Sequence, residues 1–259
     1  VRDYAGAYRS NETDPVEVAT RIMAAAHKSG SGPRGMNIFI AMDEEDLMTQ
    51  ARAARERIEQ GKPLGIFDGV PVAIKDEFHQ VPYPTTVGTA FWGNRPAPYD
   101  SFVVERLRAQ WALLIGKANM HEIGINPNGL NVHFGAVRNP YNLDHDTGGS
   151  SSGPAAAVAA GFAPVAMGAD GGGSIRVPSS YCGVVGIKPT YGRVIEYVAA
   201  PICWRVAHID SIAASVEDLV LAYGAVAGKD PRDPNSLHQP PVTVAGWNNP
   251  DLKGVRIGV

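Results

Sequence analysis

The chain has 259 residues, of which 44% are hydrophobic, and its 26 acidic residues slightly outnumber the 23 basic ones, giving a formal net charge of −3. This composition is that of a globular protein with enough apolar residues for a large core, and it excludes an intrinsically disordered chain. The near balance of charge gives no electrostatic reason for nucleic acid or an anionic membrane surface as a general partner, and it favours a small neutral substrate.

Cysteine usage and the N-terminus bear on the compartment. The two cysteines, Cys182 and Cys203, form neither a CxxC pair nor a metal-ligand pattern, which predicts reduced thiols in a cytoplasmic protein. The first residues lack the apolar core of a secretory signal, and no apolar run reaches membrane-spanning length. Because the sequence starts at Val1 and not at Met, a removed targeting segment and membrane association both stay open.

Helices and short strands are predicted in alternation along the chain. The approximate ranges are helix 14–26, strand 36–42, helix 43–60, strand 70–74, helix 102–110, strand 111–117, helix 154–161, strand 162–167, helix 215–227 and strand 254–259. Asp14 before Pro15 and Ser215 before Asp218 are typical helix starts. The alternation favours a layered α/β domain.

Two glycine-flanked turns carry serines in the run from Gly148 to Val194. Ser150 lies in the first turn, GGSSSG, and Ser174 lies in the second, GGGS. Glycine lets backbone N–H groups approach a ligand closely, and serine hydroxyls can act as nucleophile or proton relay. The apolar helix and strand predicted between the turns would hold the two hydroxyls on rigid elements.

Together with Lys75 in GVPVAIKDEF, these turns resemble the amidase signature family, over roughly residues 36–228. The resemblance implies that Ser174 is the nucleophile that forms an acyl-enzyme. It implies that Ser150, following a cis peptide bond, relays the proton and that Lys75 is the base. It also implies the amidase signature fold, an α/β fold with a mixed, twisted β-sheet flanked by α-helices. A small-molecule amide as substrate and no metal or organic cofactor are implied as well.

The chemistry of amide hydrolysis explains why these residue types are needed. It requires a nucleophile, a base, an acid for the leaving nitrogen and donors for the developing oxyanion. Lys75 is a base only in its neutral form, so we expect a desolvated setting for it, with Asp76 pointing to the other face of the strand. The expected oxyanion donors are the backbone N–H groups of Gly171, Gly172, Gly173 and Ser174.

Further residues are expected to support this site. Asp170 and Arg176 flank the second turn with opposite charges and are predicted to fix its shape, and Ser151 supports the first turn. Met120 stands where the family has a residue beside the acyl-binding channel, so the resemblance implies a role for it in substrate binding.

Other motifs fit their context less well. Ser151 is the centre of a GxSxG match, but the segment before it is polar and turn-like, whereas a nucleophile elbow follows a strand. A Ser-His-Asp arrangement could recruit His121, His133 or His208, each of which we interpret as a loop or packing residue. The GxGxxG match at 30–35 follows a helix end and is interpreted as a flexible linker.

Within the family, the segments NIFIAMDEEDLMTQA, PYPTTVGT and MHEIGINPNGLNVHFG are most similar to the plant-type fatty acid amide hydrolase branch. The substrates would then be N-acylethanolamines or primary fatty amides. The alternatives are a broad-specificity amidase and the A subunit of glutamyl-tRNA(Gln) amidotransferase, which works in a complex and touches tRNA.

Members of this family are much longer than this chain of 259 residues, which raises a further expectation. We expect one amidase signature domain that is truncated at its C-terminus, so that only the N-terminal half of the fold is present. A homodimer and a complementary chain that supplies the other half are the partners to consider. An inactive amidase-like binding fragment is the non-enzymatic alternative.

Overall fold

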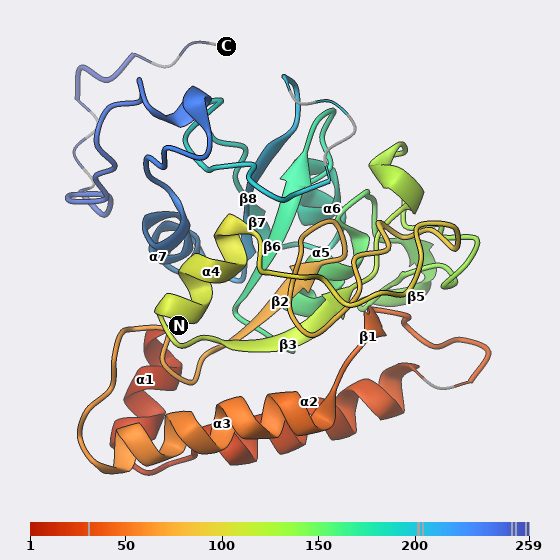
Figure 1. Ribbon diagram of the computed structural model, residues 1–259, viewed down its shortest axis with the longest axis horizontal. Helices are drawn as coiled ribbons and strands as arrows, with labels where there is room; N and C mark the ends of the chain where they lie inside the picture. Colours follow the sequence, from red (N-terminus) through yellow and green to blue (C-terminus); the bar gives the residue numbers. More distant parts are fainter. Residues whose placement is uncertain are drawn as a thin grey trace.

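The computed structural model describes residues 1–30, 32–200, 203, 205–249, 251, 253–256 and 258. At its centre lies a six-stranded sheet with the strand order β1-β3-β2-β6-β8-β7 (Figure 1). The strands of this sheet are β1 Phe39–Ala41, β2 Pro71–Lys75, β3 Leu113–Ala118, β6 Val165–Asp170, β7 Val185–Gly186 and β8 His208–Ala213. A separate two-stranded sheet joins β4 Arg138–Asn139 to β5 Asn142–Asp146.

The α-helices are α1 Arg2–Arg9, α2 Pro15–Gly30, α3 Glu44–Glu59, α4 Phe102–Ala109, α5 Ser152–Ala159, α6 Arg176–Tyr181 and α7 Val216–Val226. Short 3₁₀ turns occupy Glu122–Gly124 and Pro234–Ser236. The predicted caps are confirmed, because Asp14 accepts a hydrogen bond from the amide of Val16 and Ser215 accepts one from the amide of Asp218. No helix in the described part of the chain is both long and apolar enough to cross a membrane.

The direction of the strands determines where the ends of β2 and β6 lie. β2 pairs in parallel with both β3 and β6, whereas β8 runs antiparallel to β6, with Asp170 opposite His208. The sheet is therefore mixed, as the family resemblance implied. Because the carboxyl ends of parallel neighbours meet at one edge, Lys75 at the end of β2 and Asp170 at the end of β6 lie at the same edge of the sheet.

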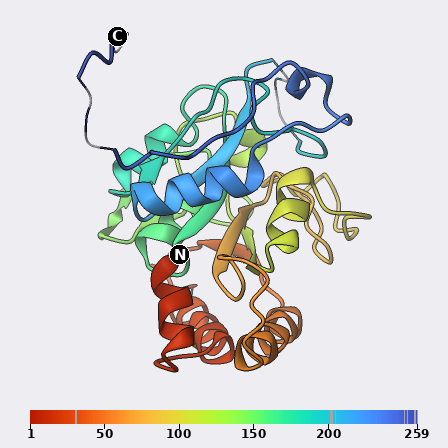
Figure 2. The ribbon, with the colours of Figure 1, turned by 90° about the vertical axis from the view of Figure 1, so that its left-hand side faces the viewer.

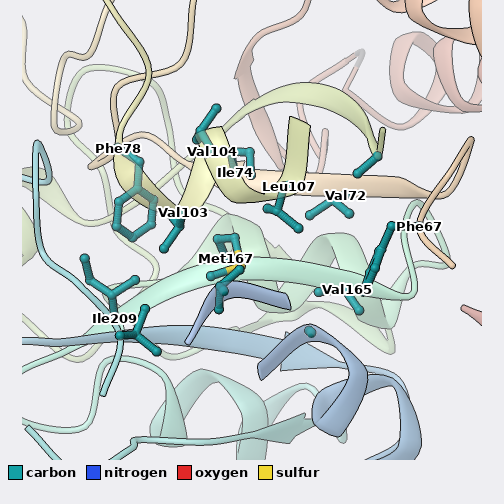
Figure 3. Close-up of a cluster of buried hydrophobic side chains, with 14 of the residues drawn as sticks. Phe67, Val72, Ile74, Phe78, Val103, Val104, Leu107, Val165, Met167 and Ile209 are labelled. Carbon is teal, nitrogen blue, oxygen red and sulfur yellow. The ribbon is translucent and has the colours of Figure 1, made fainter. Parts of the chain in front are cut away.

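One face of the sheet packs against α4 and α7 through large apolar side chains (Figure 3). Val72 and Ile74 of β2 and Met167 of β6 point to this face, where Leu107 of α4 covers them. Full burial of each such side chain contributes about 1.5–3 kcal/mol. This layer holds β2 and β6 together below the edge where Lys75 lies.

The opposite face packs against α5 and, at β3, against α3, which lies side by side with α2 (Figures 1 and 2). Its side chains are small where α5 lies, with Ala73 and Ala166 on the strands and an alanine-rich helix above them. Successive residues of a strand alternate between faces, so Lys75 shares the α5 face with Ala73. The start of α5 therefore lies beside the end of β2.

The sequence did not predict β8, whose central residues Asp210 and Ser211 are polar yet buried. Burial raises the pKa of Asp210 to about 7, although hydrogen bonds from Ser211 act in the opposite direction. The predicted strand at 254–259 is not present at residues 254–256 or 258, while residues 257 and 259 lie outside the described part.

Candidate active site

Lys75 lies at the centre of the candidate site. Its side chain is only 1% exposed, and its Nζ donates a hydrogen bond to Oγ of Ser150 at 3.0 Å. The same Nζ lies 3.5 Å from the carbonyl oxygen of Ala169. The alternation of β2 directs this amine toward α5, which brings it to the first glycine-flanked turn.

The first turn holds Ser150 against Lys75. The peptide bond between Gly149 and Ser150 is cis, as predicted. A Cβ atom on Gly149 would lie 2.1 Å from the carbonyl oxygen of Asn128, so only glycine fits at this point. The carbonyl of Ser150 accepts a hydrogen bond from the amide of His121 at 3.2 Å, which fixes the turn on its other side.

Ser151 connects the first turn to β6 and to the second turn. Its hydroxyl lies 3.2 Å from the carbonyl oxygen and 3.4 Å from the amide of Ala169, and it is completely buried. Its amide donates to the carbonyl of Ser174 at 3.1 Å. Ser151 therefore positions both turns and has no exposed hydroxyl with which to attack a substrate.

The candidate catalytic groups line one cavity of about 230 Å3. Lys75, Ser150 and Ser174 line it together, with Gly171 and Gly172 of the second turn. The remaining lining residues are Glu77, Ile123, Gly124, Ile125, Ala169, Cys203, Val206 and Ala207. The hydroxyl of Ser174 makes no hydrogen bond within the part of the chain that the structure describes, so it is available to an incoming group.

Asp170 and Arg176 hold the second turn in shape. The carboxylate of Asp170 accepts hydrogen bonds from the amides of Gly173, Ile175 and Arg176, and two more from the Arg176 guanidinium at 3.0 and 2.9 Å. Burial would raise the pKa of Asp170, but these hydrogen bonds outweigh burial and lower the pKa to about 2.

This network gives a prediction about stability and pH. The unfolded-state pKa of an aspartate is about 3.9, above the folded value, so the network's contribution to stability is complete above that pH and is lost as the pH falls toward 2. In urea titrations we expect the free energy of unfolding to fall more steeply from pH 4 to pH 2 in the wild type than in Asp170→Asn. The exposed control Asp3→Asn should keep the wild-type slope, and equal slopes for all three proteins would contradict the prediction.

Two sequence expectations about the cavity need correction. The N–H of Gly173 donates to Asp170 at 2.8 Å and is not free to bind an oxyanion, which leaves Gly171, Gly172 and Ser174 as donors. Met120 is completely buried and does not line the cavity. It lies behind Gly124, where an added Cβ atom would be 3.7 Å from the Met120 side chain, so it supports the wall.

Glu77 is a site residue that was not predicted from the sequence. Its Oε2 lies 2.7 Å from Nζ of Lys75, and its side chain is 8% exposed, so the buried Lys75 has an acidic neighbour. Asp76 points away, as predicted, and pairs with Lys117 at 3.2 Å. Glu77 stands two residues after Lys75 but in the turn that follows β2, so strand alternation does not predict the pair and no local pattern would have found it.

The three histidines considered as an alternative base make other contacts. His133 bonds to the carboxylate of Glu122 at 2.7 Å, and Nδ1 of His208 lies 2.6 Å from the carbonyl oxygen of Val206. His121 contacts the carbonyl of Glu122 and the side chain of Asn126. Within the described residues no hydrogen bond joins any of these rings to the side chain of a candidate catalytic residue.

Comparison with known proteins places this geometry in a family. The Amidase family model matches residues 23–259. The chain is 43% identical to a fatty acid amide hydrolase of Oryza sativa subsp. indica, covering 100% of this chain and 43% of that protein. It is 40% identical to the A subunit of a glutamyl-tRNA(Gln) amidotransferase from Cyanothece sp., covering 86% of this chain and 46% of that protein.

Solved structures agree with this result. The native peptide amidase from Stenotrophomonas maltophilia is similar at a TM-score of 0.88 and 30% identity, over 95% of this chain and 51% of that one. The chain thus spans about half the length, or less, of these proteins. Sequence and fold together establish that the chain belongs to the amidase family.

Proposed function

We propose that this chain carries the catalytic centre of a serine amidohydrolase that cleaves carboxylic amides through an acyl-enzyme. The observation that carries the proposal is the buried hydrogen bond of 3.0 Å between Lys75 and Ser150. It lies in a cavity that Ser174 and the backbone of Gly171 and Gly172 also line. The residues proposed as base, relay and nucleophile therefore lie around one cavity.

In the proposed reaction one proton passes from Ser174 through Ser150 to Lys75 and later returns by the same path. Neutral Lys75 takes the proton of Ser150, which takes the proton of Ser174 as the Ser174 oxygen bonds to the amide carbon. The N–H groups of Gly171, Gly172 and Ser174 stabilise the oxyanion of the tetrahedral intermediate. The proton then returns through Ser150 to the leaving nitrogen as the carbon–nitrogen bond breaks, and water hydrolyses the acyl-enzyme.

The substrates we propose are fatty acid amides, including N-acylethanolamines. The similarity to the rice fatty acid amide hydrolase supports this choice. The cavity wall supports it as well, since Ile123, Ile125, Val206 and Ala207 place apolar groups beside the catalytic residues. An acyl chain can replace water against such a wall, which favours its binding.

A role within an amidotransferase complex is the second candidate, supported by 40% identity to the Cyanothece protein. The same nucleophile would then release ammonia for a partner chain. This candidate predicts that the chain copurifies with partner chains, whereas a fatty acid amidase acts on its substrate alone. A broad-specificity amidase would differ from both because it would cleave a short aliphatic or an aryl amide faster than a fatty acid amide.

A hydrolysis panel distinguishes these candidates. We expect the protein to cleave oleamide and an N-acylethanolamine faster than a short aliphatic amide or an aryl amide, and Ser174→Ala to cleave none of them. Faster cleavage of the short or aryl amide would favour the broad-specificity amidase. If no amide is cleaved, copurifying partner chains would favour the amidotransferase, and their absence would favour an inactive binding fragment.

A further inference from the structure

Glu77 has no part in the steps above, although its carboxylate is in direct contact with the proposed base. The Glu77–Lys75 distance of 2.7 Å is shorter than the distances from Nζ of Lys75 to Ser150 and Ala169. Glu77 also lines the cavity, and only 8% of its side chain is exposed. Its carboxylate is therefore a buried anion beside the reacting groups.

The hydrogen-bonding capacity of an amine determines what this contact does. A neutral lysine has two N–H donors and one lone pair, whereas the ammonium form has three donors and no lone pair. Two neighbours of Nζ only accept hydrogen bonds, namely the ionised carboxylate of Glu77 and the carbonyl of Ala169. When Lys75 is neutral, these two occupy both of its N–H groups, and its lone pair faces Oγ of Ser150.

Glu77 is itself held in place by the chain around it. Its carbonyl accepts a hydrogen bond from the amide of Ala200 at 3.1 Å, and Phe78 forms a β-bridge with Ala199. Glu196 interacts electrostatically with both Asp233 and Glu77. Burial, followed by the charges of Asp233 and Glu77, raises the pKa of Glu196 to about 8. This shift favours the protonated form of Glu196, whereas the carboxylate of Glu77 makes the direct contact with Lys75.

We propose that Glu77 is a positioning residue for the amide hydrolysis proposed above, on which this inference rests. It turns the lone pair of neutral Lys75 toward Ser150, and its negative charge sets the pH range in which the neutral amine is available. The first effect depends on an acceptor at this position. The second depends on its charge, so the two effects can be separated by substitution.

The test compares Glu77→Gln, Glu77→Asp and Glu77→Ala with the wild type. Because an adjacent anion favours the ammonium form, we expect Glu77→Gln to move the acidic limb of the pH profile of kcat/KM to lower pH. Its plateau should change by less than about tenfold, since an amide oxygen still accepts from Nζ. Glu77→Asp should keep the limb near its wild-type position. Glu77→Ala should move the limb and also lower kcat more than tenfold, with little change in KM.

A second measurement does not depend on turnover. The fraction of Lys75 acetylated by a brief pulse of acetic anhydride, quantified by peptide mass spectrometry across pH, reports the neutral amine directly. Glu77→Gln should become acetylated at lower pH than the wild type, and the exposed control Glu12→Gln should not. If Glu77→Gln follows the wild type in both measurements, Glu77 has no such role. If the wild type hydrolyses no amide but Glu77→Gln still becomes acetylated at lower pH than the wild type, only the proposed function is overturned.

Discussion

Ser174→Ala is expected to abolish labelling by a fluorophosphonate and to lower amide hydrolysis about 10⁴-fold or more, the scale seen when a serine nucleophile is removed. The probe needs an activated hydroxyl and nearby N–H groups for its phosphoryl oxygen. In this chain Ser174 lines the cavity in the same turn as the amides of Gly171 and Gly172. Peptide mass spectrometry of the labelled wild type should locate the adduct on Ser174.

Matched variants separate this mechanism from its alternatives. Ser180→Ala, at an exposed serine on α6, should label like the wild type, while Ser150→Ala should label much more slowly because the proton path is interrupted. Replacing His121, His133 or His208 should leave labelling largely intact. An adduct on Ser151, or loss of labelling with any histidine variant, would instead indicate a histidine-based hydrolase.

Lys75→Ala is expected to affect both catalysis and stability. Removal of the base should lower kcat/KM by roughly 10²- to 10⁴-fold. The same change leaves the carboxylate of Glu77 buried without its cation, and removal of one partner of a buried pair costs about 3–5 kcal/mol in unfolding free energy. We therefore expect a marked fall in the midpoint of urea denaturation together with the loss of activity.

The double variant Lys75→Ala/Glu77→Gln tests this explanation. It should recover most of the lost stability, because no charge remains buried at the pair, while its activity should stay as low as that of Lys75→Ala. Recovery of activity together with stability would show that the single variant was inactive only because it was unfolded. Near wild-type activity in the stable double variant would exclude Lys75 as the base.

The parts of this structure that could be predicted from sequence have local signals. Asp14 and Ser215 cap helices through hydrogen bonds to amides two or three residues away, so short patterns reveal them. Ser150 and Ser174 stand in glycine-flanked turns that follow one another closely in the sequence. Lys75 ends an apolar strand in GVPVAIKDEF, a segment that itself contributes to the family resemblance, so its place at the candidate site could be predicted.

The parts that could not be predicted depend on contacts between distant segments. In β8, Asp210 interrupts the apolar pattern by which a buried strand is recognised, and only the neighbouring strand β6 explains its position. Whether Gly173 offers its N–H to a substrate depends on where the carboxylate of Asp170 points. A sequence pattern cannot specify such directions, because they follow from the packing of the whole turn.

The order in which the sheet is assembled has a consequence for synthesis of the chain. Lys75 finds its neighbours Ser150 and Ala169 only 75 and 94 residues later in the sequence, and contacts of this separation form slowly because a long loop must close first. During translation β2 leaves the ribosome well before β6, so the amine of Lys75 stays hydrated while the adjacent strand is still missing. Under the proposed mechanism, a growing chain would become competent for acylation only after the second glycine-rich turn has emerged and β6 has paired with β2, whereas β7 and β8, which complete the sheet, follow later in the chain.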